Sequence, residues 1–202
     1  MNEPRTKRGE LTKTKILTAA EEVFAELGYQ LASITKITQR AGVGQGTFYL
    51  YFSSKLDVFE QLVEDLNRRV RHAMSEGAAR GANRAESERE GFREFFRFTA
   101  EHPALYRVVR EAEQVSPASM RGHYERIVSG YIDGLQDALR EGEIAEQDPE
   151  VTAWALMGVG EMIGMRYVLW EREQEARIPE HVFDEMVAFV QRALGTGRDE
   201  RG

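Results

Sequence analysis

The side chains best suited to chemical recognition lie between positions 33 and 55, where amide, hydroxyl, phenol and amine groups follow one another closely. Gln45 carries a primary amide that matches the hydrogen-bonding edge of adenine, and Thr47 can contact a thymine methyl group or a phosphate. Gly46 has no side chain, so the backbone can approach a nucleic acid closely there. The other candidates suit phosphate oxygens, which orient a protein on DNA without specifying sequence: Ser33, Thr35, Tyr49, Tyr51 and Lys55.

The charge of the chain is distributed in a way that agrees with this chemistry. No Asp or Glu occurs between positions 28 and 56, whereas Lys36, Arg40 and Lys55 do. Residues 1–56 have a net charge of +3 and residues 57–202 a net charge of −10. This asymmetry indicates an N-terminal part that faces DNA and a body with another role. The basic residues of positions 1–10 could form either a plain tail or an arm that touches phosphates.

Short helices must position these groups, and the sequence has the signals for them. Ser33 is a favourable N-cap residue, and Gly42 suits the left-handed position that ends a helix. A second helix is expected over residues 45–52, with Phe48 and Phe52 on its apolar side. Two helices joined by a short glycine-containing turn, the second polar and aromatic on its outer side, are typical of a helix-turn-helix. Flanking helices are expected over residues 11–27 and 54–74, the second one capped by Ser54.

These residues also carry a resemblance to a known family. Gly28-Tyr29, Ser33-Ile34, Ala41-Gly42-Val43, Gly46-Thr47-Phe48-Tyr49 and Tyr51-Phe52 resemble, in type and spacing, the DNA-binding domain of the TetR family of transcriptional regulators. The resemblance covers roughly the first 60 residues. It implies that the recognition residues named above are the positions that contact DNA. The sequence departs from the usual family pattern at three positions, Ala32, Thr38 and Gly44.

The rest of the chain has helical periodicity and no alternating strand pattern. A stretch rich in Gly, Ala and charge, residues 76–90, is expected to connect two domains. Helices are then expected over residues 90–101, 105–115, 116–142, 148–170 and 179–194. The predicted fold class is therefore all-α: an N-terminal three-helix helix-turn-helix head and a C-terminal antiparallel helical ligand-binding and dimerisation domain. The expected domains are residues 1–56 and 75–202, linked by the helix over 54–74.

Composition excludes several classes of function. The chain has no cysteine, so disulfides and zinc-thiolate sites are excluded. Its four histidines are scattered and most simply lie at surfaces or interfaces, so no metal site, cofactor or catalytic set is predicted. The N-terminus has no apolar core of a signal peptide, and the most apolar stretch, residues 153–170, contains Glu161 and Arg166. A cytoplasmic protein that does not cross a membrane is expected.

By resemblance to the family, the body should hold a small-molecule pocket and a dimer interface. Aromatic residues and methionines at helical spacing usually form core. A subset combines apolar walls with polar groups, as ligand pockets do, and its apolarity indicates a hydrophobic effector. The predicted ligand-binding residues are Phe96, Tyr106, Tyr124, Tyr131, Met157 and Glu161.

The last two predicted helices are apolar over more than one stripe, so another surface must cover them. The resemblance implies that this surface is a second subunit, giving a homodimer that binds a palindromic double-stranded DNA operator. The predicted interface residues are Met165, Val168, Trp170, Met186, Phe189 and Val190.

The sequence thus predicts a ligand-responsive DNA-binding regulator, in the first instance a repressor. We expect Gln45→Ala to relax base preference and Lys55→Ala to weaken binding to all DNA sequences alike. An activator or a ligand-independent architectural DNA-binding protein of the same fold remains an alternative. The rival from another class is a helical small-molecule-binding or catalytic protein whose head does not bind DNA.

Overall fold

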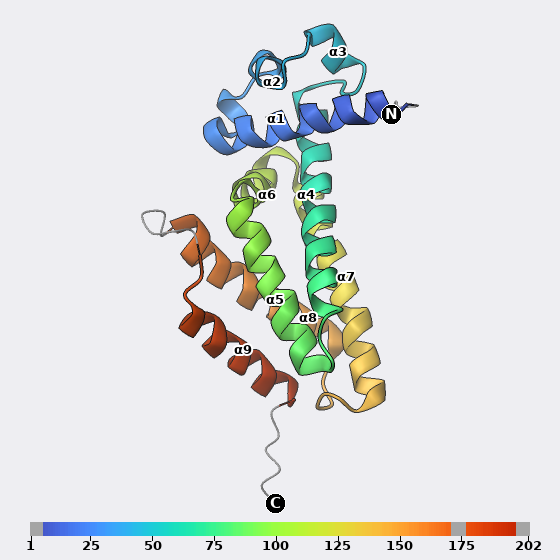
Figure 1. The fold of residues 1–202 in the computed structure, drawn as a ribbon, viewed down its shortest axis with the longest axis vertical. Helices are drawn as coiled ribbons and strands as arrows, with labels where there is room; N and C mark the ends of the chain where they lie inside the picture. Colours follow the sequence, from blue (N-terminus) through green and yellow to red (C-terminus); the bar gives the residue numbers. More distant parts are fainter. Residues whose placement is uncertain (1–5, 171–176, 197–202) are drawn as a thin grey trace, which may run out of the picture. The chain divides into compact units, whose positions relative to one another are not determined.

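The computed structural model of the chain describes residues 6–170 and 177–196. Arg5, one of the basic residues at positions 1–10, lies outside the described residues, as do residues 197–202. Over the described residues the chain is helical and contains no strand, as the sequence predicted (Figure 1). In chain order the elements are α1 (Lys7–Leu31), α2 (Ile34–Ala41), α3 (Gln45–Tyr49), α4 (Lys55–Ala78), α5 (Arg84–Glu101), α6 (Ala104–Val115), α7 (Pro117–Glu141), α8 (Pro149–Gly164), a π-helical segment η1 (Met165–Trp170) and α9 (Glu180–Leu194).

The chain divides into two compact units, and each combines two stretches of sequence. The first unit contains residues 1–67 and 103–123, and the second contains residues 68–102 and 124–202. Both α4 and α7 therefore contribute residues to each unit. The helix α6, which follows α5 in the sequence, belongs to the unit that contains α1, α2 and α3.

The first unit is built on α1, which packs against α2 and α6. The buried face of α1 includes Ile16, Val23 and Phe24. The ring of Phe24 meets the ring of Phe59 edge-on at 5.2 Å between centroids. Figure 1 shows α1, α2 and α3 gathered at the start of α4. A single apolar core thus holds the helix-turn-helix and the beginning of α4 together.

Gly28 interrupts the helical backbone of α1, as its sequence position predicted. Its φ of +71° lies in the left-handed region, which glycine adopts without strain. A Cβ at this position would lie 2.5 Å from Oε1 of Glu111. Oε2 of the same carboxylate accepts a hydrogen bond of 2.8 Å from the backbone N–H of Tyr29. The backbone angle favours glycine here, and a Cβ would also displace the carboxylate of Glu111 on α6.

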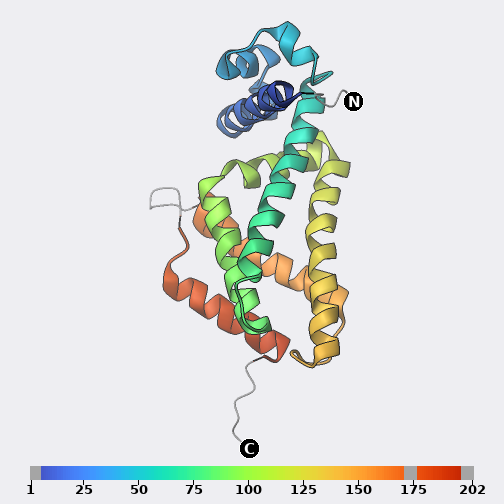
Figure 2. The same ribbon diagram turned by 45° about the vertical axis from the view of Figure 1, so that its right-hand side comes forward.

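In the second unit, α8 and α9 both pack against α5 (Figures 1 and 2). Glycine permits a close approach of α8 to α5 at Gly160. A Cβ on Gly160 would lie 3.0 Å from the ring of Phe92 and 3.6 Å from that of Phe95, both on α5. None of the described helices has the length and apolar character that crossing a bilayer requires.

Several predicted element bounds were wrong, among them the start of α1, which begins at Lys7 and not at residue 11. The predicted connection over residues 76–90 is mostly helix, because α4 continues to Ala78 and α5 already begins at Arg84. The side chain of Asn83 starts α5 by accepting a hydrogen bond from the N–H of Glu86. Gly77 lies within α4 and has to be glycine there, because a Cβ would lie 2.5 Å from the carbonyl oxygen of Glu90. Two other helices, α3 and α8, end earlier than expected: α3 stops at Tyr49, and α8 gives way to η1 after Gly164.

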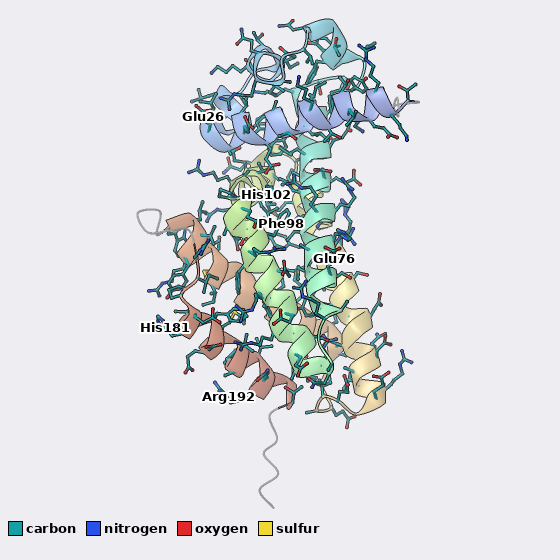
Figure 3. The ribbon with its side chains drawn as sticks, in the orientation of Figure 1. Glu26, Glu76, Phe98, His102, His181 and Arg192 are labelled. Atoms are coloured by element: carbon teal, nitrogen blue, oxygen red, sulfur yellow. The ribbon has the colours of Figure 1, made fainter. Side chains whose placement is uncertain are left out.

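The end of α5 lies where the sequence predicted, at the residue before Pro103. His102 has φ −124° and ψ 63°, outside the helical region, and its N–H still donates to the carbonyl of Phe98. The ring of His102 lies 4.5 Å from that of Phe98 (Figure 3). Proline disfavours helix in the preceding residue, so the chain turns here towards α6.

Candidate DNA-binding site and ligand cavity

The helix-turn-helix forms through the local signals that the sequence predicted. The Ser33 hydroxyl accepts a hydrogen bond of 3.2 Å from the N–H of Lys36, which caps α2. Gly42 ends α2 with a φ of +61°. Gly44 starts α3 without a side-chain cap, and its carbonyl accepts from the N–H of Thr47 at 2.9 Å. Phe48 is fully buried and anchors α3 on the core. These contacts fix which residues of α3 face outward.

The outward side of α2 and α3 is polar and open. Gln45 and Thr35 are exposed, and the Gln45 amide donates to the Thr35 hydroxyl at 2.9 Å. Gly46 is exposed, and a Cβ placed on it would meet nothing within 4 Å. Ser33 and Thr47 are half-buried. The structure therefore brings the two residues with base-reading chemistry, Gln45 and Thr47, onto the same short helix beside an unobstructed backbone.

The two tyrosines differ in their surroundings. Tyr49 is 55% exposed, with its ring edge-on to that of Phe48 at 5.5 Å. Tyr51 follows the end of α3 and is half-buried. Packing within the first unit therefore explains the position of Tyr51 better than that of Tyr49, which is more than half exposed.

Lys55 lies in an unexpected environment for a residue predicted to contact phosphate. Its ammonium donates to the carbonyl oxygens of Tyr29 at 2.8 Å and Ala32 at 3.0 Å. It also lies 4.3 Å from the centroid of the Tyr29 ring. The side chain is part-buried. In this arrangement Lys55 joins the start of α4 to the end of α1, and its charge is directed at protein carbonyls.

Arg40 is a second cation with protein partners. Its guanidinium forms ion pairs with Glu22 at 2.9 Å and Glu26 at 2.8 Å, both on α1. Figure 3 labels Glu26 near the end of α1. The hydrogen bond to Glu22, followed by that to Glu26, raises the pKa of Arg40. Residues 28–56 contain no acidic residue, but the positive charge available there is smaller than their sequence indicates, because α1 supplies two carboxylates that pair with Arg40.

The helix α1 also contributes cations that the sequence interpretation did not include in the site. Lys15 is exposed, and its ammonium lies 3.7 Å from the position of a Cβ on Gly42, at the helix-turn-helix turn. Lys13 lies 5.9 Å from the centroid of the Phe52 ring. In the sequence, the alternation of threonine and lysine in Thr12-Lys13-Thr14-Lys15 was the available signal for these two cations. Their proximity to the turn could not be predicted from it, because it depends on how α1 packs.

The six predicted ligand-binding residues do not line one cavity. Phe96 belongs to an aromatic cluster with Phe95 and Phe183. The Tyr124 hydroxyl donates to Glu161 at 3.1 Å, which joins α7 to α8. The other three are distributed as follows: Tyr106 is buried on α6 in the first unit, Met157 is half-buried on α8, and Tyr131 lines a cavity.

This cavity, named here the α4/α5/α7 cavity, lies wholly in the second unit and has a volume of about 340 Å³. Sequence reasoning missed most of its wall, because the residues come from three helices separated in the chain. Glu88 and Arg84 form an ion pair inside it, and the Tyr131 hydroxyl donates to Glu88 at 2.9 Å. The lining residues are Arg71, Met74, Ser75, Ala78, Arg84, Ser87, Glu88, Gly91, Ile127, Gly130, Tyr131 and Gly134.

The polar groups of the α4/α5/α7 cavity are strongly shielded from water. The side chains of Glu88 and Arg84 are 3% and 14% exposed. Burial raises the pKa of the Glu88 carboxyl, and the charge of Arg84 and the Tyr131 hydroxyl counteract part of this rise. Burial, followed by the negative charge of Glu88, raises the pKa of Tyr131 well above its usual value. Tyr131 therefore remains a hydrogen-bond donor at neutral pH.

The predicted interface residues separate into an exposed and an interior group. Trp170 is 57% and Phe189 52% exposed, and Met165 is half-buried. Val168 and Val190, at 2% and 0% exposed, are buried within the folded chain. Met186 is largely buried but borders an apolar groove of about 480 Å³ between α8 and α9, the α8/α9 groove. Its lining residues are Val159, Met162, Ile163, His181, Val182, Glu185, Met186 and Phe189.

No group of three or more metal-binding side chains gathers anywhere in the described ranges. Of the four histidines, His123 differs from the sequence expectation of a surface or interface position. It is 4% exposed, and its carbonyl accepts from the amide of Asn67 at 2.9 Å. It is a core residue of the first unit.

An all-helical chain with an outward-facing helix-turn-helix is the architecture of a DNA-binding transcriptional regulator. Residues 16–62 match the family model described as "Bacterial regulatory proteins, tetR family". The chain is 24% identical to the HTH-type transcriptional regulator YhgD of Bacillus subtilis over 149 residues, covering 72% of this chain and 78% of that protein. It is 31% identical to the fatty acid metabolism regulator protein of the same organism over 128 residues, 63% of this chain and 66% of that protein. The chain belongs to the TetR family and is a transcription regulator, not an enzyme.

Solved structures show the same fold. The transcriptional regulator FadR from Bacillus subtilis, crystallised in complex with stearoyl-CoA, superposes with a TM-score of 0.77 and 21% sequence identity. The match covers 91% of this chain and 98% of that one. The likeness in fold therefore extends beyond the helix-turn-helix to the later helices.

Proposed function

We propose that this protein is a homodimeric repressor that binds a palindromic operator and is released from it by a small hydrophobic effector. The observation that carries the proposal is the exposed side of α2 and α3. Gln45, Thr35 and Gly46 form a polar, unobstructed surface on a helix-turn-helix whose own sequence contains no carboxylate. Such a surface suits base reading in a major groove.

Within this proposal, Gln45 and Thr47 read bases, and Ser33, Thr35, Tyr49 and Tyr51 contact phosphates. Gln45 exchanges its hydrogen bond to Thr35 for one to a base, so DNA binding also frees the Thr35 hydroxyl for a phosphate. Lys55 acts by holding the end of α1 against the start of α4. The domains keep their proposed roles, with DNA binding in residues 1–56 and effector binding and dimerisation in residues 75–202.

Exposed apolar surface on the last helices supports dimerisation. Trp170, Phe189 and Met162 are between 52% and 57% exposed, and large apolar side chains gathered in one region mark interaction surfaces. A two-fold dimer that covers the α8/α9 groove would place its two recognition helices about 34 Å or more apart, on successive turns of the major groove. Each head alone would bind weakly, so operator binding would depend on this contact.

The relatives support an effector that carries an acyl chain. One is named a fatty acid metabolism regulator, and another was crystallised with stearoyl-CoA. The α4 helix offers a physical route for the response. It begins in the first unit, and its residues Arg71, Met74, Ser75 and Ala78 line the α4/α5/α7 cavity. If the effector binds best to one position of α4 and DNA binds best to another, each ligand lowers the affinity of the protein for the other.

The proposal can be tested with the purified protein in three measurements. Light scattering at micromolar concentration should give a dimer, and Phe189→Glu should give a monomer. Selection from random DNA should return a palindrome, which Gln45→Ala should bind with reduced base preference. Fluorescence anisotropy on that palindrome should show release by acyl compounds. A monomeric wild-type protein, or selected DNA without two-fold symmetry, would contradict the dimeric repressor, and a reporter activated by the protein would favour an activator.

A further inference from the structure

The two charged side chains that α5 contributes to the α4/α5/α7 cavity balance each other. Glu88 and Arg84 form an ion pair, and Oε2 of Glu88 accepts a hydrogen bond of 2.9 Å from the Tyr131 hydroxyl. Arg71, at the wall formed by α4, also interacts within the protein. A ligand with a carboxylate would place a second negative charge beside Glu88, and like charges repel strongly where the dielectric constant is low. The cavity is therefore better suited to an uncharged ligand than to an acid.

Although its charge is balanced, the guanidinium of Arg84 has hydrogen-bond donors that the protein does not use. A guanidinium supplies five N–H donors and no acceptor. Nη2 of Arg84 donates to Glu88, whereas Nε is buried and has no hydrogen-bond partner in the part of the chain that the structure describes. A buried donor without a partner costs free energy, because it has lost its water and gained nothing in exchange. The cluster therefore lacks a hydrogen-bond acceptor and not a charge.

Glycines keep the space beside this guanidinium open. A Cβ on Gly134 of α7 would lie 2.9 Å from Nη1 of Arg84, so Nη1 lies at the part of the wall that α7 forms. Gly130, one turn earlier, also lines the cavity, and a Cβ placed on it would meet nothing within 4 Å. The wall continues with side chains that carry no charge: Met74, Ser75, Ala78, Ser87 and Ile127.

We infer that the α4/α5/α7 cavity binds an uncharged carbonyl compound with a short apolar chain, such as a ketone or an ester, and discriminates against the free acid. The carbonyl oxygen accepts a hydrogen bond from the guanidinium of Arg84, and the chain lies against Met74 and Ile127. A carbonyl group supplies the missing acceptor and adds no charge beside Glu88. The inference rests on the proposed effector response and narrows it: the effector is a neutral acyl compound, and the cavity reads its carbonyl oxygen.

The first test compares ligands with similar chains and three head groups. Isothermal titration of the full-length protein with 2-octanone, octanoate and octylamine measures the effect of ligand charge. The ketone should bind at least about tenfold more tightly than either ion, because a charge loses its hydration in the cavity and finds no free counter-charge there. Octanoate or octylamine binding as tightly as 2-octanone, or no 2-octanone binding at millimolar concentration, would overturn the inference.

The second test removes the balancing charge. Glu88→Gln keeps the shape of the side chain and an acceptor oxygen but leaves Arg84 without its counter-charge. Octanoate should then gain at least about tenfold in affinity, whereas 2-octanone should change little. Glu86→Gln is the matched control, since Glu86 is an exposed carboxylate on the same helix and does not line the cavity. Octanoate binding that stays as weak as in the wild type, in a Glu88→Gln protein with a cooperative melting transition, would contradict the charge argument.

The third test locates the ligand and does not depend on the stability of Glu88→Gln. Gly130→Leu places a side chain in open space at the wall, so 2-octanone should bind at least about tenfold more weakly. The fold should be retained, because glycine is unfavourable in a helix interior. Gly158→Leu is the matched control: a Cβ on Gly158 of α8 also meets nothing within 4 Å, and this residue does not line the cavity. Wild-type affinity of Gly130→Leu for 2-octanone would assign the ligand to another site and overturn the inference.

These titrations contain no DNA. Their failure therefore leaves the repressor proposal standing, and a failure of operator binding leaves the cavity assignment standing.

Discussion

Replacing Lys55 by methionine separates two roles that the same side chain could have. In the structure its ammonium donates to two carbonyl oxygens, of Tyr29 and Ala32, and lies over the Tyr29 ring. Hydrogen bonds that involve a charged group contribute about 1.5–3 kcal/mol when buried. Because the site is only part-buried, we expect the pair of bonds and the ring contact to contribute about 2 kcal/mol together. For a chain of this length that corresponds to a fall in Tm of roughly 4–8 °C.

The same variant makes a second, independent prediction about DNA. Each phosphate neutralised by a protein cation adds about 0.9 to the slope of the logarithm of affinity against the logarithm of salt concentration. If Lys55 binds protein carbonyls, Lys55→Met should lower the DNA affinity but leave that slope unchanged. Differential scanning calorimetry and anisotropy titrations at several salt concentrations measure the two quantities.

Lys36→Met is the matched control, since Lys36 is exposed and its ammonium donates to one carbonyl, of Leu31, at 3.1 Å. It should change Tm little. An unchanged Tm for Lys55→Met, combined with a slope smaller by about one per protomer, would refute the reasoning. That result would show that Lys55 leaves its carbonyl partners for a phosphate, as the sequence alone predicted.

Four other outcomes are expected. Gln45→Ala should flatten the base preference measured by competition among operator variants, while Tm stays within about 1 °C because Gln45 is exposed. Gly28→Ala should lower the stability by about 1–3 kcal/mol in a urea titration, because alanine is strained at a φ of +71° and its Cβ would collide with Glu111. Glu111→Ala should also lower Tm, since the N–H of Tyr29 loses its acceptor. Phe189→Glu should give a monomer by light scattering, whereas Val190→Ala, at an interior position, should lower Tm and leave the dimer intact.

The correct sequence predictions rested on short-range physics. Ser33 caps α2 because its hydroxyl reaches an N–H three residues later, and Gly42 ends α2 because glycine tolerates a positive φ. Apolar residues at helical spacing placed α6, α7 and α9 to within a few residues. These effects act within one or two helical turns, so the local sequence contains all the information needed.

The errors arose where distant segments meet. Glycine and charge over residues 76–90 resembled a linker, yet Gly77 lies within α4, where the backbone of α5 comes so close that a Cβ does not fit. The phosphate role predicted for Lys55 stays untested, but nothing in the sequence indicated its two carbonyl partners, which lie more than 20 positions earlier in the chain. In the same way, the two valines predicted at the interface, Val168 on η1 and Val190 on α9, are buried within the folded chain.

By itself the sequence determined the class of the protein, its all-helical fold and the short motif that meets DNA, because capping, periodicity and turn residues act locally. Only the tertiary structure decided which cations remain available to DNA and which side chains share a cavity. Arg40 is neutralised by carboxylates on another helix, and Arg84, Glu88 and Tyr131 meet only after three helices have packed. Charges and hydrogen bonds act through space, so their partners follow from the fold.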